Sequence, residues 1–410
     1  MTADPPDRKA SGFKAHVPLE QARDALLNRV TPIQRTETVA LGTADGRVLA
    51  EPIVADRNVP AYRRAAMDGY ALTAEATFGA TDRSPSVLRL RETADRLDRD
   101  EATAVHTGSA VPAGTDAVVP IEQATPRGDE LEVESPVATG DNVAPVGEDI
   151  SAGEHLYEPG DRLGPAGLGV LKSIGRTTVE VYARPRVGVI PTGEELVQRN
   201  PDAGEAIETN GLTVSRYVSR WGGHPEYRDV VTDDRDALRA AIQRDLTKDL
   251  VVTTGGSSVG KRDLLPEVIG DLGEVLIHGV GLKPGHPVAL GVVQSTPVIA
   301  LPGYPVSCIV TAMQFLRPAV KHLRREHSDP IPTTQAILDG KIRSKPGIQT
   351  FARVELDQSV TPPVAAPIRA SGAGVLSSAA RADGWVVVPE QREGLPADET
   401  VSVEHWEAHL

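Results

Sequence analysis

Apolar residues near the start of the chain recur with the period of a helix. Four of them are spaced to lie on one helix face: Leu19, Ala22, Leu26 and Leu27. Because positions three and four apart share a face, we expect a short amphipathic helix here. A second short helix is expected over residues 43–50.

The pattern changes over residues 51–142, where short apolar runs alternate with Gly, Pro and Asp. One such run is Ala117-Val118-Val119, which Pro120 interrupts. Short runs between turn residues are typical of strands, so we predict a small β-rich domain. Beyond it, a helix is expected over 165–174 and a strand over 179–182.

From about residue 184 to residue 325, apolar runs alternate with helical patterns. Val187 to Ile190 is a continuous apolar run, as in a strand that is buried on both faces. Further strands are expected over 250–253, 288–291 and 297–301, and helices over 209–220, 236–245, 262–272 and 306–323. Because strands alternate with helices, we predict a doubly wound parallel sheet.

After residue 328 the chain becomes β-rich again. Strands are expected around Ile337, over 351–354 and over 385–388. This break in the pattern predicts a separate small C-terminal β domain.

Composition narrows the class of protein. A chain of 410 residues, 40% of them hydrophobic, has the length of roughly two to four domains. A formal net charge of -14 makes nucleic acid or an anionic membrane an unfavourable partner. No run reaches the ~18 apolar residues of a membrane span, and the charged start lacks the apolar region of a signal peptide. We therefore expect a cytoplasmic protein that binds neither nucleic acid nor membranes.

The single cysteine, Cys308, excludes an intramolecular disulfide. Its neighbours Val306, Ile309 and Val310 are apolar, and no basic residue close in sequence would activate a thiolate. A buried structural thiol is expected.

Candidate chemistry begins with the glycine-rich turn Thr253 to Gly260, between an expected strand and an expected helix. Glycines let backbone N–H groups approach a phosphate closely, and the start of a helix adds partial positive charge. The predicted phosphate-binding residues of this turn are Gly255, Gly256, Ser257, Ser258 and Gly260. A simple tight turn is the structural alternative.

The same turn nearly matches a P-loop, because Gly255 and Gly260-Lys261 have the required spacing. Arg262, however, stands where a Ser or Thr would bind Mg²⁺, and no partner acidic strand is evident. A P-loop nucleoside triphosphatase is therefore the weaker alternative.

Other predicted strand ends in this region also carry polar or rigid segments. Thr192 and Gly193 follow one strand and are suited to cradle a phosphate. The loop Leu301 to Ser307 and the segment Lys283 to Pro287 are stiffened by prolines, and Lys283 adds a positive charge. Plain turns and a solvated lysine are the alternatives.

Three carboxylates near these strand ends are candidate metal ligands: Glu195, Asp233 and Asp263. The alternatives are structural. A lone acid is usually a solvated surface residue, and an acid at the start of a helix is favoured by the helix dipole. Clustered beside a phosphate site, they suggest a divalent cation, for which Mg²⁺ is the default.

Several motifs in register resemble one family over nearly the whole chain. They are residues 64–71, 107–108, 112–119, 147–150, 191–196, 253–263, 283–285 and 301–307. The family is molybdopterin molybdenumtransferase, which includes the gephyrin E domain.

The resemblance implies a multidomain α/β plus β subunit. Its expected parts are a helical linker domain from residues 16–50 and 145–180, an inserted β-rich domain over 51–144, a molybdopterin-binding domain with a doubly wound parallel sheet over 181–328, and a C-terminal β-barrel-like domain over 329–410. Family members are elongated homodimers. The active site is expected between the α/β domain of one subunit and the inserted domain of the other.

The implied reaction inserts molybdate into adenylylated molybdopterin, forms the molybdenum cofactor and releases AMP with the help of Mg²⁺. By motif match, the residues expected to act in catalysis are Asp68, Thr107, Asp149, Glu195, Asp233 and Asp263. Besides the glycine-rich turn, the expected substrate-binding residues are Thr192, Gly193, Asn210, Lys283, Pro302, Pro305, Arg353 and Ser371. Strict register places Ala373, rather than Ser371, at the family's serine.

The sequence departs from the family pattern at three positions. Tyr304 stands where the family often has Asn, His286 where it has a second Lys, and Gly279 at a further basic position. The implied site is less positive, which bears on the choice between molybdate and tungstate. Two other functions stay open: an adenylyltransferase that uses ATP and molybdopterin, and a binding or scaffold protein that retains the pocket without turnover.

Overall fold

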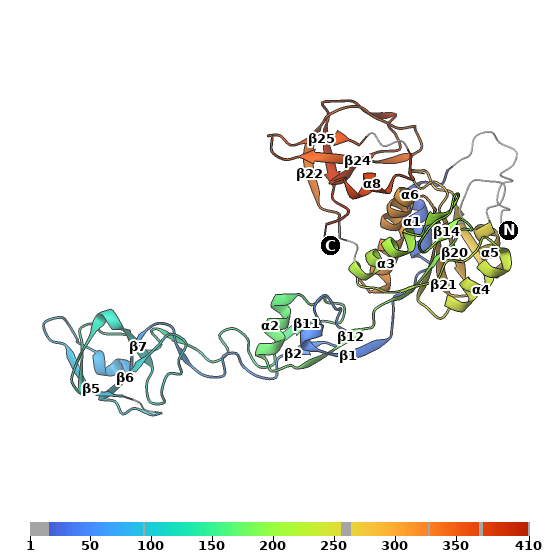
Figure 1. The fold of residues 1–410 in the computed structure, drawn as a ribbon. Helices are drawn as coiled ribbons and strands as arrows, with labels where there is room; N and C mark the ends of the chain where they lie inside the picture. Colours follow the sequence, from blue (N-terminus) through green and yellow to red (C-terminus); the bar gives the residue numbers. More distant parts are fainter. Residues whose placement is uncertain (1–15, 93–94, 256–263, 327–328, 369–371, 409–410) are drawn as a thin grey trace, which may run out of the picture. The chain divides into compact units, whose positions relative to one another are not determined.

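The computed structural model describes residues 16–92, 95–255, 264–326, 329–368 and 372–408. The chain forms two compact units, one of Thr38–Val181 and the other of Met1–Glu37 with Tyr182–Leu410 (Figure 1). Within the described residues, no helix has the length and apolar character needed to cross a membrane.

The first unit contains a six-stranded sheet in the order β7-β4-β6-β5-β9-β8. Its strands are β4 (Gly69–Leu72), β5 (Ser86–Arg91), β6 (Glu101–Val105), β7 (Ala117–Pro120), β8 (Ala124–Arg127) and β9 (Glu130–Val133). Leu72, Leu88 and Leu131 are fully or almost fully buried in the core of this sheet. The predicted β-rich character of the segment is thus confirmed.

The rest of this unit has a second core around helix α2 (Pro165–Ser173), where Leu49, Ile53 and Leu171 are fully buried. Its strands form short pairs: β1 (Thr36–Ala40) with β12 (Thr178–Tyr182), β2 (Ile53–Val54) with β11 (His155–Tyr157), and β3 (Arg64–Ala65) with β10 (Val143–Ala144). The predicted helix over 165–174 is confirmed.

The helix expected over 43–50 is wrong. A 3-10 turn ends at Thr43, and Gly46 has a φ of 67°, which a right-handed helix does not allow. Val48 and Leu49 instead form β-bridges to Arg162 and Val181. Pairing with distant segments therefore overrides the local pattern.

The second unit is built on a six-stranded sheet in the order β16-β13-β17-β21-β20-β18. The strands are β13 (Arg186–Pro191), β16 (His224–Tyr227), β17 (Leu250–Thr254), β18 (Glu274–His278), β20 (Ala289–Val293) and β21 (Thr296–Leu301). The predicted parallel arrangement holds for β16, β13, β17 and β21. Strand β20 is antiparallel to both neighbours. The two residues that join it to β21, Gln294 and Ser295, are too few for the crossover helix that a parallel pairing would need.

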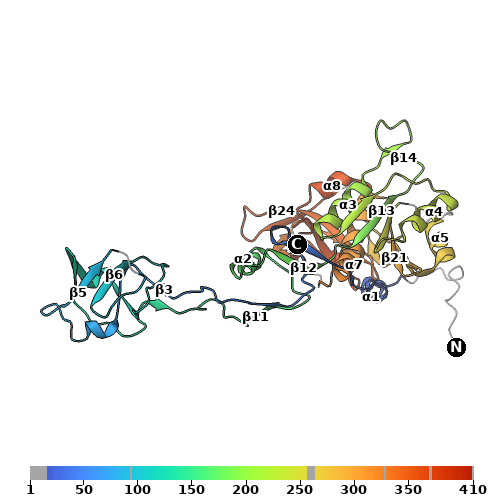
Figure 2. The same cartoon turned by 90° about the horizontal axis from the view of Figure 1, so that it is seen from below.

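Helices cover both faces of this sheet (Figures 1 and 2). One core contains residues of α4 (Arg235–Asp245) and α5 (Leu264–Leu272). The other contains residues of α1 (Leu19–Leu27), α3 (Asn210–Arg220), α6 (Pro305–Thr311) and α7 (Arg317–Leu323). Leu19, Ala22 and Leu26 are buried, which confirms the amphipathic face of α1, and the two cores confirm the doubly wound prediction.

The predicted closing helix over 306–323 is present, with a π-helical turn, η4 (Ala312–Leu316), between α6 and α7. Pro318 has no backbone N–H to donate, which suits a change in the hydrogen-bond pattern here. Cys308 lies buried in α6, and burial raises the pKa of its thiol, as expected of a structural cysteine.

The C-terminal strands follow the order β19-β24-β25-β22-β28-β26, and a further β24–β26 pairing closes them into a barrel. They are β19 (Leu282–Lys283), β22 (Thr333–Leu338), β24 (Gln349–Asp357), β25 (Val364–Pro367), β26 (Gly384–Val388) and β28 (Thr400–Glu404). A short pair, β23 (Ile342–Arg343) and β27 (Gly394–Leu395), and helix α8 (Leu376–Ala380) complete the domain. The predicted barrel-like domain is confirmed.

The barrel also shares a core with the α/β domain. Trp385 and Trp406 stack with ring centroids 4.5 Å apart, and Phe351 meets Trp385 edge-on at 5.3 Å. These rings belong to the same buried cluster as Phe315 and Leu316 of η4. Apolar burial therefore fixes β24 of the barrel against the α/β domain.

We predict that Trp406→Ala destabilises this unit by about 3–5 kcal/mol, because it leaves a large cavity under Trp385. Chemical denaturation followed by tryptophan fluorescence measures the change. Trp406→Phe, which keeps a ring in the stack, is the matched control and should cost much less. Equal losses in the two variants would contradict the packing role of the ring.

Candidate functional site

Three loops meet at the carboxyl edge of the parallel strands. The Thr192 N–H donates to the Thr254 carbonyl oxygen at 3.1 Å, and the Gly255 N–H donates to that of Leu301 at 3.0 Å. Backbone hydrogen bonds therefore hold the carboxyl ends of β13, β17 and β21 next to one another. In an open α/β sheet, this edge is where ligands bind.

Gly255 lies where the backbone after β17 closely approaches the backbone after β13. A Cβ atom there would lie 2.1 Å from the Thr192 carbonyl oxygen, and the φ of Gly255 is 117°. Only glycine suits both conditions. The other predicted residues of the turn, Gly256, Ser257, Ser258, Gly260 and the metal candidate Asp263, lie outside the described residues.

Three threonine hydroxyls are buried at this edge: those of Thr192, Thr253 and Thr254. Within the described residues none of them has a hydrogen-bond partner. A buried hydroxyl without a partner costs about 1–3 kcal/mol. Thr192 was predicted from the sequence as a binding residue, and the hydroxyls of Thr253 and Thr254 add two further potential donors at this strand edge.

The loop after β21 is held by the predicted residue Asn210. Its Nδ2 donates to the Gly303 carbonyl oxygen at 2.7 Å. Pro302 is buried, Pro305 lies in the first turn of α6, and the side chain of Tyr304 is 68% exposed. Asn210 thus holds this loop through a contact with the protein itself, and the substrate-binding roles of Asn210 and the two prolines stay predictions.

Sequence reasoning missed the pair Glu208 and Tyr227, which lies at the start of α3. Glu208 is 6% exposed, accepts a hydrogen bond from the Gly211 N–H at 2.6 Å and receives another from the Tyr227 hydroxyl. Burial and the bond to Glu208 raise the pKa of Tyr227 to about 12. An acid directly before the expected helix was the available signal, since carboxylates favour helix N-termini.

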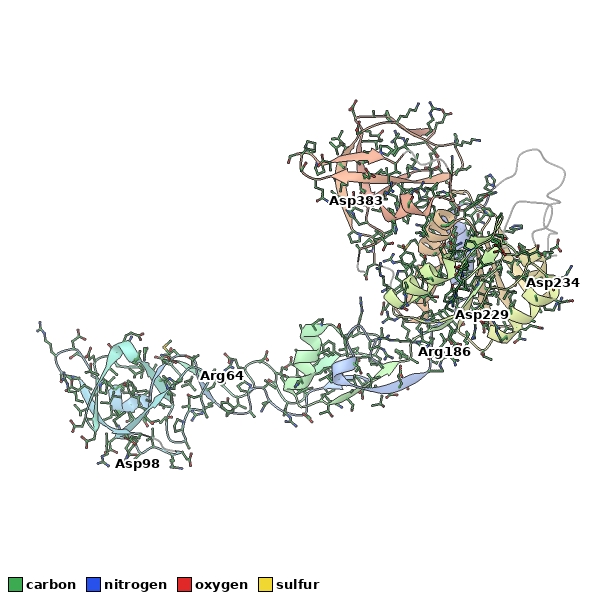
Figure 3. All side chains as sticks on the ribbon, in the orientation of Figure 1. Arg64, Asp98, Arg186, Asp229, Asp234 and Asp383 are labelled. Carbon is green, nitrogen blue, oxygen red and sulfur yellow. The ribbon has the colours of Figure 1, made fainter. Side chains whose placement is uncertain are left out.

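The predicted acids Glu195 and Asp233 come together beside these loops. The Gly193 N–H donates to the Val231 carbonyl oxygen at 3.1 Å, which places residues 231–233 next to 192–195. Asp234, labelled in Figure 3, caps α4 by accepting from two backbone N–H groups. Burial, then the charges of Glu195 and Glu194, raise the pKa of Asp233.

A divalent cation fits this arrangement in part. One oxygen of Asp233, Oδ1, is buried without a partner among the described residues. Repulsion between the carboxylates would be relieved by a cation, and Mg²⁺ needs only one or two carboxylates when waters and phosphate oxygens complete its shell. The described residues contain no group of three such ligands, and the third candidate, Asp263, is outside them.

A second feature, here called the cationic pocket, lies between the α/β domain and the barrel. It is a cavity of about 690 Å³ whose described lining contains five ionisable side chains, all basic: His16, Lys283, His286, Lys341 and Arg353. Burial lowers the pKa of Arg353, and its Nε has no partner among the described residues. Lys283 and Arg353 thus line one cavity, and their predicted part in anion binding stays a prediction.

Ser371 lies outside the described residues, while Gly372 and Ala373 line the cationic pocket. The Ala373 carbonyl oxygen accepts a hydrogen bond from the Val306 N–H at 3.0 Å. This bond connects the segment after residue 371 to the start of α6.

The other unit contains the remaining candidates. Thr107 donates two hydrogen bonds to Asp68 Oδ1, from its N–H at 2.7 Å and from its hydroxyl at 2.8 Å. These bonds, the backbone one first, lower the pKa of Asp68. The structure therefore joins two residues that were predicted independently from separate motifs.

Asp149 is exposed in the turn that follows β10. Its N–H donates to the Val59 carbonyl oxygen at 3.0 Å, and its neighbour Glu148 pairs with Arg64 at 2.7 Å (Arg64 is labelled in Figure 3). Among the described residues no hydrogen bond joins Asp149 to Asp68 or Thr107. It is not part of that pair.

Comparison with known proteins covers all of these segments. Residues 17–175 match the MoeA N-terminal region (domain I and II), residues 188–322 a probable molybdopterin binding domain, and residues 335–406 the MoeA C-terminal region (domain IV). A putative molybdopterin biosynthesis protein of Methanocaldococcus jannaschii is 32% identical over 95% of this chain and 98% of its own. The chain belongs to the MoeA family.

Two further relatives agree with this assignment. A molybdopterin molybdenumtransferase of Haemophilus influenzae is 30% identical over 94% of this chain and 98% of its own. The crystal structure of a MoeA molybdopterin biosynthesis protein from Pyrococcus horikoshii has a TM-score of 0.82 at 33% identity, over 96% of this chain and 100% of its own. The MoeA resemblance found in the sequence motifs is confirmed.

We predict that Thr107→Val raises the pKa of Asp68 toward its ordinary value, because one of two donors to the carboxylate is lost. NMR titration of chain labelled with ¹³C-aspartate measures it. Since the folded pKa of Asp68 is depressed, its contribution to stability is present above the unfolded pKa and is lost as pH falls through the folded one. In the variant the folded pKa lies nearer the unfolded one, so the contribution is smaller and its loss is complete at a higher pH.

Thr107→Ser retains both donors and is the matched control. If the valine and serine variants titrate alike, the hydroxyl does not hold the carboxylate.

Proposed function

We propose that this protein inserts molybdate into adenylylated molybdopterin, forming the molybdenum cofactor and releasing AMP. Membership of the MoeA family supports a transferase of molybdenum cofactor biosynthesis. The observation that carries the proposal is the cationic pocket in the same unit as the glycine-lined strand edge. The cationic pocket suits a free oxyanion, and the strand edge suits the phosphates of a nucleotide-linked pterin.

The strand edge is suited to the phosphate end of the substrate. Gly255 exposes backbone at the point of closest approach, and the hydroxyls of Thr192 and Thr254 are available for hydrogen bonds. Asn210 holds the loop after β21 in place, so this side of the strand-edge site is ordered before a ligand binds. Glu195 and Asp233 would hold Mg²⁺, which would neutralise charge on the phosphoanhydride.

The cationic pocket is suited to molybdate, a compact dianion. Arg353 is half-buried and its Nε has no partner among the described residues, so an oxyanion would both accept its hydrogen bond and offset its cost of burial. Lys283 adds a second positive charge. No carboxylate of the described lining competes with the ligand for either cation.

Asp68 and Thr107 belong to the other compact unit, and we propose that they complete the site from the partner subunit of a homodimer. The depressed pKa keeps Asp68 ionised at neutral pH. Its carboxylate can therefore accept a hydrogen bond from an O–H or N–H group of the substrate or from water. Its orientation is fixed by the two bonds from Thr107. This arrangement suits positioning of substrate or water.

We predict AMP release from adenylylated molybdopterin only when molybdate and a divalent cation are both present. Asp68→Asn should reduce the rate about 100-fold, because a positioned charge is lost. Chromatographic measurement of AMP follows the reaction. Asp82→Asn, an exposed aspartate in a turn of the same domain, is the matched control.

AMP release without molybdate, or no release under any of these conditions, would refute the proposed reaction. Consumption of ATP with free molybdopterin would instead identify an adenylyltransferase. Tight molybdopterin binding without turnover would identify a scaffold.

We predict that Arg353→Gln weakens molybdate binding about 10- to 100-fold, because a charge-assisted hydrogen bond in a partly buried site is lost. Equilibrium dialysis with molybdate alone measures the dissociation constant. Arg343→Gln removes an arginine of β23 that does not line the pocket and should bind as the wild type does. Equal weakening in both variants would mean that only the overall charge matters.

A further inference from the structure

His286 distinguishes the cationic pocket from a site with permanent charges only. It lies between β19 and β20, beside Lys283, and lines the cavity with Arg353. Lysine and arginine remain charged throughout the physiological range, whereas histidine gains or loses its charge within it. The net charge of the pocket therefore depends on its histidines.

A hydrogen bond fixes which nitrogen of His286 titrates. Its Nδ1 lies 2.7 Å from the Val280 carbonyl oxygen. A carbonyl oxygen can only accept, so Nδ1 carries a hydrogen whether the ring is neutral or charged. Nε2 is consequently the atom that takes up or releases the proton.

His16 sits against the same ring. The two imidazole centroids are 4.3 Å apart, and the ring planes meet at 72°. The chain beside His16 is held in place, because Val17 bridges to Val280 and accepts a hydrogen bond from the Gly281 N–H at 2.9 Å. Two charged rings at this separation would repel each other.

We propose that His286 is an oxyanion-binding residue whose protonated ring tightens binding, so that affinity for molybdate falls as pH rises. The inference rests on the proposed function in taking molybdate as the ligand. The ionisable groups that share the pocket with His286 are His16, Lys283, Lys341 and Arg353, and the adjoining strand β18 ends at His278. No carboxylate in the described lining would neutralise a protonated ring.

The direction of the pH dependence follows from the linkage between molybdate binding and protonation of the ring. A bound dianion stabilises the charged ring, so binding is tighter when the ring is protonated and weakens as pH rises. With one proton linked to binding, the dissociation constant rises by at most about tenfold per pH unit. Molybdate itself stays a dianion across this range, which leaves the protein as the source of any slope.

The test measures binding of molybdate alone to the full chain at constant ionic strength, between about pH 6 and pH 8. The wild type should weaken about five- to tenfold across this range. His286→Gln should bind weakly at every pH, near the high-pH value of the wild type. His286→Lys should bind tightly at every pH, since its charge does not titrate here.

Two further variants identify the titrating group. His224→Gln removes an exposed histidine of β16 outside the pocket and should keep the wild-type slope. His16→Gln should also keep a slope, because His286 still titrates. The assignment to His286 is overturned if the dissociation constant of His286→Gln changes with pH as in the wild type, or if that of His286→Lys changes with pH at all. If the pH dependence is lost only in His16→Gln, the proton belongs to His16.

Failure of this inference can be told apart from failure of the proposed function. Binding that is equally tight at every pH refutes only the role of His286. No binding of molybdate by the wild type at any pH refutes the oxyanion site itself. Thermal unfolding confirms that each variant is folded, and if His286→Gln is not, the profile of His286→Lys decides.

Discussion

The parallel pairing of β19 with β24 is the constraint on which the cationic pocket depends. Leu282 pairs with Gln349 and Lys283 with Thr350, so a two-residue strand that lies in the chain between β18 and β20 of the α/β sheet joins the barrel. The Gln349 N–H donates to the Gly281 carbonyl oxygen at 2.8 Å and extends this pairing. Because Arg353 lies further along β24, the same register that aligns Lys283 also brings the guanidinium to the cavity. The shared core around Trp385 keeps that register in place.

The charges of the pocket oppose those of the chain as a whole. A formal net charge of -14 repels a dianion at long range, and salt screens that repulsion over about 10 Å. Inside the cavity the described ionisable groups are all basic, so the local field has the opposite sign. Burial lowers the pKa of Arg353, which shows that its charge is held at a cost. An anion offsets that cost, and so binding and desolvation act on the same group.

Local sequence patterns predicted the elements better than the contacts between them. The period of α1 and the apolar run of β13 identified both correctly, because burial of one face or of two faces leaves a direct signal. The helix expected over 43–50 failed since Leu49 pairs with Val181, far along the chain. Barrel closure by β24 and β26 and the burial of Glu208 are likewise long-range effects. The family motifs implied a binding role for Lys283 and for Arg353 separately, and no spacing in the sequence indicated that the two line one cavity.

The acids of the two units are placed in opposite electrostatic environments. Asp68 is exposed, yet a Cβ on the next residue, Gly69, would lie 2.0 Å from the Val119 carbonyl oxygen, so backbone packing fixes its position. Donors from Thr107 keep Asp68 ionised, whereas burial and neighbouring carboxylates make Asp233 easier to protonate. Carboxylates whose pKa values are pushed apart in this way are suited to different tasks. Asp68 can accept hydrogen bonds without a counter-ion, while Asp233 keeps its charge most readily when a cation is bound beside it.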